Sequence, residues 1–373
     1  MADIIVIRSN SIIYNPRVGK IARSLKKRYS ILVLGWNRES LPKKIINSYA
    51  TDLSLFNLRA PFGKTILIAY MPLFWIWIFI KLISDRPNAI HACDLDTILP
   101  CYIYKILFRK RLVFDVCDRY AMAYVPPKFK RIYSLVNWVE ENFGKKVDVL
   151  VNVSEELFRT FHITPKRSAI IMNCAEDYIE VPASAGEDAN NKVKSKVLRL
   201  IFTGGIRRKR GLEVLVSALK DLSNVELVVL GRSVDSELHC QILEQANIIY
   251  KGLLKPAEVL TLESQSDVVI SLYDLKDPIS NFSMGNKIFE AMMLGLPMIT
   301  NVATELVNEH KCGITVDYNN EKQIREIIVS LRDNVEFRKT LGRNGRQAFL
   351  KKYNWQVMEQ ELYKIYDPLV SKT

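Results

Sequence analysis

One short segment, residues 283–297, combines the groups needed to bind an anion at the start of a helix. Ser283, Gly285 and Asn286 can offer backbone N–H groups and a cap there, where the helix dipole favours phosphate. Lys287 adds a full positive charge beside them. Together these groups could hold a diphosphate.

Glu290 follows Lys287 by three residues, so both side chains fall on one face of the predicted helix. A carboxylate at this position could accept hydrogen bonds from the two hydroxyls of a ribose. Ordinary capped helices with a surface ion pair show the same spacing, so this segment alone leaves both interpretations open. The first of them predicts a nucleotide diphosphate site.

A glycine-rich basic loop, residues 203–211, follows a predicted strand and opens a predicted helix. Gly204 and Gly205 would let the backbone approach a ligand closely. Four consecutive cations follow, and among them Arg207 and Arg210 could contact phosphate oxygens through their guanidinium groups. Most charge runs are solvated loops, but a Gly-Gly turn at the carboxyl end of a strand favours a phosphate site.

The elements that must position these residues alternate between strand and helix along the whole chain, which indicates parallel sheets with helical crossovers. In the first half we predict strands at 4–8, 30–34, 89–92, 111–115, 149–153 and 169–172, with helices at 17–28, 97–108 and 130–145. In the second half we predict strands at 198–203, 225–230, 248–250, 268–271, 298–300 and 313–316, with helices at 212–222, 236–244, 256–264, 287–294, 321–333 and 335–353.

With 373 residues the chain is too long for one typical core, and two doubly wound domains facing each other across a cleft are the simplest architecture. Residues 1–180 are the predicted first domain and residues 197–352 the second. Between them, residues 181–196 lack apolar periodicity and read as a linker. The last segment, residues 353–373, is a predicted helix.

The net charge of +13 is concentrated in the first half of the chain. Residues 1–180 hold 27 Lys and Arg against 16 Asp and Glu, a net charge of +11, while the remainder holds 26 against 24, a net charge of +2. An anionic membrane surface or a nucleic acid could attract such a domain. A soluble basic protein without a polyanionic partner stays open as well.

Residues 65–80 contain no charged side chain and are rich in aromatic residues. The run is short for a transmembrane helix, which needs about 20 apolar residues, and Pro72 interrupts it. Two interpretations remain open: a helix docked at the headgroup boundary, with flanking Lys64 and Lys81 as anchors, or a helix buried between layers.

Six cysteines are scattered without the spacing of a zinc site or a disulfide framework. The N-terminus shows no basic leader before its first apolar stretch. We therefore expect a cytoplasmic protein, with peripheral association to the inner face of the cell membrane as an option.

The chain resembles the family 4 retaining glycosyltransferases, known also as glycosyl transferases group 1, which have the GT-B fold. The resemblance rests on Gly204, on Arg210-Gly211 before the next helix, and on the run from Lys287 to Pro297. In the first half, Asn15-Pro-Arg-Val and Ile-His91-Ala-Cys-Asp-Leu-Asp are similar to the family's Asp-Pro-Arg-Val and Ile-His-Ala-His-Asp-Leu. The resemblance implies an α/β protein of two Rossmann-like domains, with the final helix packing back on the first.

The resemblance also implies roles for individual residues. Arg210 and Lys287 match cations that bind the donor diphosphate, and Glu290 matches the glutamate that grips the ribose. The family's other glutamate is replaced by Phe282, so Asn281, Ser283 or backbone groups would hold the sugar. The full predicted donor site comprises Gly204, Gly205, Arg207, Arg210, Arg232, Leu254, Ser283, Met284, Gly285, Asn286, Lys287 and Glu290.

On the acceptor side the resemblance points to Asn15, Arg17, Asp94 and Asp118, with His91 and Asp94 joining Arg210 and Lys287 as candidate catalytic residues. A histidine at a strand end is more often structural than catalytic, and Asp94 could instead cap the following helix. The leaving phosphate itself helps to deprotonate the acceptor in enzymes of this type, so no metal and no cofactor are expected.

These inferences predict a metal-independent retaining hexosyltransferase that uses a nucleotide diphosphate sugar and a glycan or lipid-linked acceptor, as in polysaccharide or glycolipid assembly. The alternatives are a nucleotide-sugar epimerase of the same fold, a basic nucleic-acid-binding protein, and a degenerate transferase kept as a scaffold. Phe282 speaks against the epimerase, and the lack of a recognisable RNA or DNA module speaks against nucleic acid.

Overall fold

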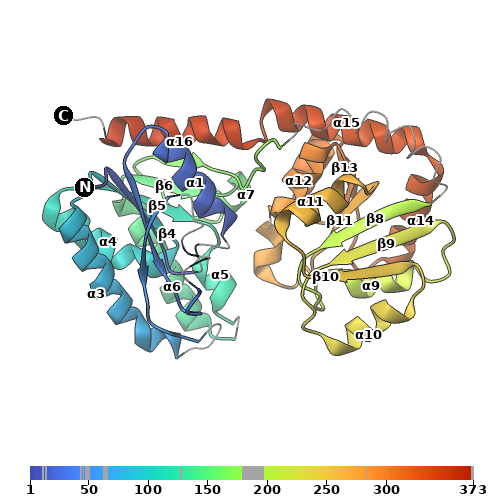
Figure 1. Ribbon diagram of the computed structural model, residues 1–373, viewed down its shortest axis with the longest axis horizontal. Coiled ribbons are helices and arrows are strands. Elements are labelled where there is room, and N and C mark those ends of the chain that lie inside the picture. Colours follow the sequence, from blue (N-terminus) through green and yellow to red (C-terminus); the bar gives the residue numbers. More distant parts are fainter. Residues whose placement is uncertain are drawn as a thin grey trace. The chain divides into compact units, whose positions relative to one another are not determined.

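The computed structural model describes residues 1–10, 12, 15–42, 44, 46, 51–61, 66–126, 128–178, 197–282 and 284–370. They form two compact units, the first made of Met1–Met172 and Gln356–Thr373 and the second of Asn173–Trp355. Each unit has its own parallel sheet flanked by helices (Figure 1). The predicted α/β class with two doubly wound sheets is confirmed. The predicted linker, residues 181–196, lies outside the described residues.

The sheet of the first unit has the strand order β3-β2-β1-β4-β5-β6-β7, and every neighbouring pair is parallel. Its strands are β1 (Ile4–Arg8), β2 (Ile31–Trp36), β3 (Asp52–Phe56), β4 (Ala89–Cys93), β5 (Arg111–Val116), β6 (Val149–Asn152) and β7 (Ser168–Ile170). The strands β1, β4, β5 and β6 are almost fully buried, which explains their continuous apolar runs.

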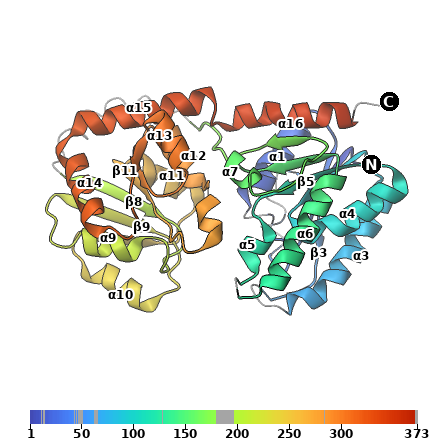
Figure 2. The same cartoon turned by 180° about the vertical axis from the view of Figure 1, so that it is seen from behind.

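The helices of the first unit are α1 (Pro16–Lys26), α3 (Leu67–Asp85), α4 (Leu95–Phe108), α5 (Tyr120–Tyr124), α6 (Lys130–Lys146) and α7 (Glu155–Phe158), together with α16 (Trp355–Val370). Figures 1 and 2 show α1 and α16 on one side of the sheet and α3, α4 and α6 on the other. The last helix joins this unit through polar contacts, because Lys27 bonds to Glu359 and the Tyr363 hydroxyl donates to the Ser24 carbonyl.

The second unit repeats the plan with the strand order β10-β9-β8-β11-β12-β13. Its strands are β8 (Leu198–Thr203), β9 (Val225–Leu230), β10 (Ile248–Gly252), β11 (Val268–Ser271), β12 (Met298–Thr300) and β13 (Gly313–Thr315). Its helices are α9 (Leu212–Ala218), α10 (Ser236–Glu244), α11 (Pro256–Ser264), α12 (Asn286–Leu294), α13 (Thr304–His310), α14 (Glu321–Asp333) and α15 (Val335–Lys351), with a 3-10 turn at Pro278–Phe282.

Helix α3 contains most of the uncharged run predicted at residues 65–80. Its inner stripe packs into the core, where Phe74 stacks on Trp36 with ring centroids 4.8 Å apart and Trp77 lies 5.6 Å from Phe56. Among the described residues it is the one helix long and apolar enough to cross a membrane by length and composition. Only 22% of its most apolar stretch is buried, because one side of the helix packs in the core and the other side is exposed. Neither a fully buried helix nor a helix docked only at a membrane surface describes it completely.

Candidate functional site

The predicted donor residues of the second unit lie at the carboxyl ends of its strands, where parallel sheets bind ligands. The loop after β8 touches the loop after β9, because a side chain at Gly231 would begin 1.8 Å from the Gly204 carbonyl oxygen. Both glycines have positive φ angles, 149° and 141°. Gly205, in contrast, faces open space within 4 Å. The backbone at Gly204 is thus packed against the neighbouring loop, whereas the backbone at Gly205 is open. An open backbone of this kind allows a ligand to approach closely.

Arg210 folds back over this loop. Its guanidinium lies 3.2 Å from the point where a side chain at Gly204 would begin, and it covers the Tyr273 ring at 4.2 Å from the centroid. The Tyr273 hydroxyl in turn lies 3.2 Å from the corresponding point of Gly285, the N-cap of α12. Tyr273 therefore bridges the two segments that the sequence proposed separately for phosphate binding.

Among the described residues, the Arg210 Nε is buried and has no hydrogen-bond partner. A buried charged donor without a partner is costly unless a ligand satisfies it. This observation makes Arg210 the strongest candidate to contact a phosphate oxygen.

The other predicted cations of the loop point elsewhere. Arg208 forms ion pairs with Asp235 at 3.3 Å and Glu237 at 2.8 Å, so it supports α10. Arg207 and Arg232 are exposed. Arg207 has no ion pair among the described residues and stays available for a ligand.

Lys287 lies in the first turn of α12 between two carboxylates. Its Nζ is 2.6 Å from Glu290 Oε2, as the spacing predicts, and 2.9 Å from Glu263 Oε1. Burial disfavours the charged ammonium, but Glu290 and Glu263 outweigh it and raise the pKa of Lys287 above its usual value. Lys287 therefore carries a full positive charge at neutral pH.

Glu263, near the end of α11, is a site residue that the sequence reasoning missed. Its side chain is only 2% exposed, and it accepts a hydrogen bond from Thr203 Oγ1 at 3.1 Å besides the one from Lys287. Burial raises the pKa of Glu263, while Lys287 and Thr203 oppose the shift. One signal was present in the sequence, because Glu263 follows Val259 and Leu260 at helical spacing and so falls on the apolar side of α11.

The remaining predicted donor residues surround the start of α12. Gly285 and Asn286 are half-buried and Met284 is buried. Leu254, after β10, is half-buried. Asn281 donates to the Leu275 carbonyl at 3.2 Å. Ser283 lies outside the described residues.

In the first unit, Asp94 follows β4 with a backbone φ of 63°, which is rare for a residue other than glycine. Its carboxylate does not cap α4, the alternative that the sequence left open. Instead Asp94 pairs with Arg8 at 3.0 Å and accepts a hydrogen bond from the Cys117 backbone at 3.1 Å. Strained backbone of this kind costs roughly 1–3 kcal/mol and gathers at functional sites.

Polar groups around Asp94 line the same edge of the first sheet. Asp96, in the first turn of α4, accepts a hydrogen bond from the Ser9 hydroxyl, and burial raises the pKa of Asp96 to about 6. Asp118 is exposed just beyond β5. Asn15 caps α1 by accepting the Val18 N–H at 3.1 Å, a structural use compatible with its predicted acceptor role.

Arg17 and His91 are buried deeper than their predicted roles suggest. Arg17 forms a bidentate pair with Asp115, at 2.9 and 2.6 Å, and donates to the Ile171 carbonyl at 2.5 Å. His91 is 0% exposed, with Nε2 at 3.1 Å from Asp115 and Nδ1 at 2.5 Å from the Tyr366 hydroxyl. The geometry favours positioning roles for both, and their direct contact with an acceptor stays a prediction.

The hydrogen bonds assign the His91 tautomer. A carboxylate only accepts, so Nε2 carries the proton toward Asp115 and Nδ1 accepts from the Tyr366 hydroxyl. Burial disfavours the charged carboxylate, yet Arg17 and His91 hold the pKa of Asp115 well below its usual range. Asp115 therefore remains ionised and joins β5 to α1, β4 and α16.

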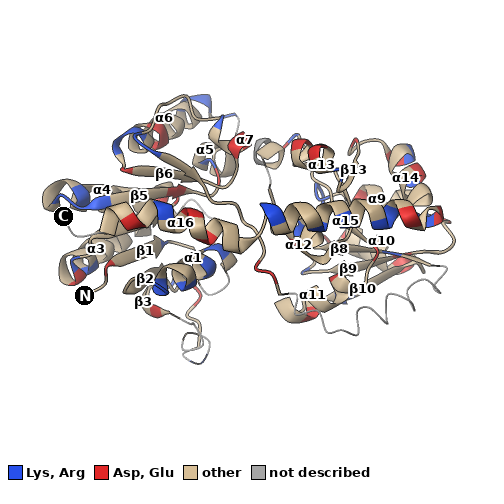
Figure 3. Ribbon diagram, turned by 90° about the horizontal axis from the view of Figure 1, so that it is seen from above, with Lys and Arg blue, Asp and Glu red and all other residues tan. Residues whose placement is uncertain are grey.

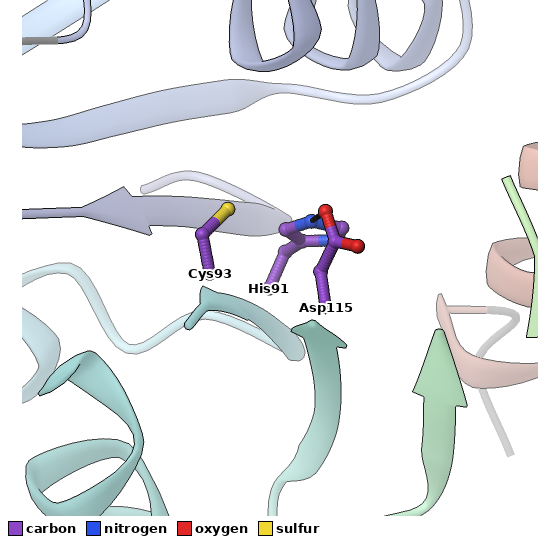
Figure 4. Close-up of side chains that lie close together, drawn as sticks. All are labelled: His91, Cys93 and Asp115. Atoms are coloured by element: carbon purple, nitrogen blue, oxygen red, sulfur yellow. Dashed lines mark hydrogen bonds and ion pairs between the residues drawn. The ribbon is translucent and has the colours of Figure 1, made fainter. Parts of the chain in front are cut away.

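His91, Cys93 and Asp115 could also be considered as metal ligands, since their ligand atoms lie within 4.8 Å of one another (Figure 4). The surroundings oppose this use. Arg17 already occupies both Asp115 oxygens, and burial raises the pKa of the Cys93 thiol well above its usual value. A thiol that resists ionisation beside a fixed guanidinium is a poor ligand for a cation.

The whole-chain fold matches solved glycosyltransferases. Sucrose-phosphate synthase from Thermosynechococcus elongatus aligns with a TM-score of 0.80 at 16% identity and covers 99% of both chains. HepE from Anabaena aligns with a TM-score of 0.76 at 14% identity, covering 99% of this chain and 100% of HepE. The chain thus has the GT-B fold, with two parallel α/β units whose candidate binding loops lie at the carboxyl ends of the strands.

Sequence comparison finds similarity to glycosyltransferases. Residues 198–334 match glycosyl transferases group 1. An uncharacterized glycosyltransferase of Methanocaldococcus jannaschii is 25% identical over 297 residues, 74% of this chain and 73% of that protein. The capsular polysaccharide biosynthesis glycosyltransferase CapM of Staphylococcus aureus is 26% identical over 202 residues, 49% of this chain and 51% of CapM. The chain is thus similar to the group 1 glycosyltransferases over residues 198–334, as its motifs predict.

Proposed function

We propose that this glycosyltransferase moves a hexose from a nucleotide diphosphate to an acceptor with retention of anomeric configuration. The observation that carries the proposal is the bridge from Gly204 through Arg210 and Tyr273 to Gly285, which joins the two segments of the second unit that are predicted to bind phosphate. HepE has been solved with UDP and glucose, which supports a nucleotide sugar as the donor here.

Arg210 and Lys287 would bind the diphosphate, and Glu290 would accept hydrogen bonds from the ribose. In the transfer, the bond between the anomeric carbon and the diphosphate oxygen breaks. The acceptor oxygen bonds to the same face of that carbon, and its proton passes to the departing phosphate oxygen. Two fixed cations stabilise the charge that develops on the leaving group, so the proposed reaction needs no metal.

Asp94 would orient an acceptor hydroxyl, and the fixing of its carboxylate by Arg8 and the Cys117 backbone at the carboxyl edge of the first sheet supports this role. We propose an acceptor that is lipid-linked or membrane-proximal, within polysaccharide or glycolipid assembly. The name of CapM and the exposed apolar side of α3 support this part of the proposal. Cytoplasmic location with peripheral membrane association follows from it.

Thermal shift with UDP, GDP, ADP, CDP and TDP and their hexose conjugates, each with and without EDTA, tests the donor. Stabilisation by one nucleotide that survives EDTA and is lost in the double variant Lys287→Ala/Glu290→Ala is expected. If no nucleotide raises the melting temperature, the donor site is wrong. Retention is tested by proton NMR of the first-formed glycoside, whose anomeric coupling must equal that of the donor.

A further inference from the structure

Three neighbouring helices of the first unit share an outward apolar surface. Helix α4 contacts α3 on one side and α6 on the other, and Figures 1 and 2 show all three on the face of the sheet away from α16. Their exposed large apolar side chains, here called the apolar face, are Leu73, Ile76, Ile80 and Ile83 of α3, Leu99, Ile103, Ile106 and Leu107 of α4, and Ile132, Leu135 and Trp138 of α6.

The pattern within α3 separates this surface from the core. Met71, Phe74, Ile78 and Leu82 form a buried stripe at helical spacing, while Leu73, Ile76, Ile80 and Ile83 form a second stripe that is exposed. The buried stripe packs on Trp36 and its neighbours, so α3 cannot leave the helical layer to span a bilayer without losing these contacts. An orientation parallel to a membrane plane keeps the inner stripe buried and covers the outer one.

Cations border the apolar face. Helices α3, α4 and α6 each connect parallel strands, so they run in the same direction and end along one edge. Exposed Arg86, Arg109, Lys145 and Lys146 occupy these ends, and exposed Lys130 and Arg131 begin α6. Figure 3 shows the basic residues of α4 and α6 on the ribbon. The combination of exposed aliphatic side chains with bordering Lys and Arg is typical of surfaces that bind anionic bilayers.

We propose that the apolar face docks on a bilayer containing anionic phospholipid, with α3, α4 and α6 lying in the interfacial plane. Apolar side chains exposed together on one face of a protein mark interaction sites. A second copy of the chain would bring the same cations together, whereas phosphate headgroups neutralise them. The inference deepens the proposed membrane-proximal acceptor, but vesicle binding needs neither donor nor acceptor and is measured without them.

Vesicle flotation of the full chain tests the proposal. Wild-type protein is expected to float with mixed phosphatidylcholine and phosphatidylglycerol vesicles and to bind pure phosphatidylcholine at least several-fold less. The double variant Ile76→Ser/Ile106→Ser removes two side chains that are each 58% exposed, and it should lower binding on the order of tenfold. The double variant Lys145→Gln/Lys146→Gln should lower it by a similar factor and flatten its dependence on phosphatidylglycerol.

A matched control is available in the second unit. Leu243 and Leu350 are 60% and 55% exposed, so Leu243→Ser/Leu350→Ser removes similar exposed apolar area without touching the face. It should float like the wild type. The proposal is overturned if the wild type stays unbound, or if the Ile76/Ile106 variant floats equally well. It is also overturned if that variant instead abolishes a concentration-dependent dimer, which would make the face a self-interface.

Nucleotide-induced thermal shift in the same Ile76/Ile106 variant separates this inference from the proposed function. If the variant keeps its nucleotide-induced thermal shift but no longer floats with vesicles, the docking surface is supported. A preserved shift with unchanged flotation overturns the docking surface and leaves the donor site standing.

Discussion

The ammonium of Lys287 is bonded to the buried carboxylate of Glu263, 2.9 Å away, before any donor binds. Glu263 is in turn bonded to Thr203, the last residue before the Gly-Gly turn. Lys287, the cation predicted to bind the donor, is thus connected through the Glu263 carboxylate to the end of β8. A diphosphate must either share Lys287 with its carboxylates or draw it away from them.

Replacing Lys287 by Gln should weaken nucleotide diphosphate binding on the order of tenfold to hundredfold, since a charge-assisted hydrogen bond is lost. Isothermal titration calorimetry measures the change. Lys322→Gln, at an exposed position of α14, is the matched control and should bind like the wild type. Equal affinities in all three proteins would remove Lys287 from the site.

Glu263 should make donor affinity depend on pH. Because burial raises the pKa of Glu263, lowering the pH neutralises it before ordinary carboxylates, and Lys287 then has one competitor fewer. Affinity for a nucleotide diphosphate sugar, whose diphosphate does not titrate near neutrality, should therefore rise as the pH falls. In Glu263→Gln this dependence should be lost, with affinity high throughout. Parallel pH profiles for the two proteins would contradict the competition.

Two glycines of the donor loops should respond differently to alanine. Gly231→Ala places a methyl group against the Gly204 carbonyl at a positive φ, which should cost about 2–4 kcal/mol of unfolding free energy. Gly205→Ala meets open space and should change stability by less than about 1 kcal/mol while weakening nucleotide binding. Urea unfolding and calorimetry check both. A stable Gly231→Ala protein would mean that the loops do not touch.

Asp115→Asn should lower the unfolding free energy by about 3–5 kcal/mol at neutral pH, because it leaves Arg17 buried without its anion. The native pKa of Asp115 is depressed, so its contribution is full above the unfolded value of about 4 and is lost as the pH falls below it. The difference in unfolding free energy between the wild type and Asp115→Asn should therefore become smaller as the pH is lowered.

The control for this pair is Asp333→Asn, which breaks an exposed arginine pair with Arg332 and should leave the free energy of unfolding nearly unchanged. Chemical denaturation at several pH values provides the comparison. A constant gap across the acidic range would show that Asp115 does not titrate with folding.

The sequence predicted the fold wherever an element carried its own signal. β8, β9 and β11 begin and end where predicted, because most of their residues are buried and apolar. β3 was missed, since it is a half-buried edge strand of five residues with weak alternation.

Contacts between side chains that are distant in sequence could not be predicted from local sequence patterns. Lys287 and Glu290 are three residues apart and were predicted to pair, whereas Glu263 is 24 residues from Lys287 and Tyr366 is 275 residues from His91. Only the assembled layers bring these groups together. The burial of His91 likewise depends on α16, which no local pattern around β4 reveals.

The return of α16 to the first unit also determines the order in which the protein can be completed during synthesis. Residues 173–355 form a continuous unit that can fold as soon as they leave the ribosome. The first unit is complete only after α16 has been translated, although most of it is made earlier, because Tyr366 packs beside His91. Until translation reaches that helix, the first unit lacks the side chain that covers His91, and apolar surface left exposed in this way favours aggregation.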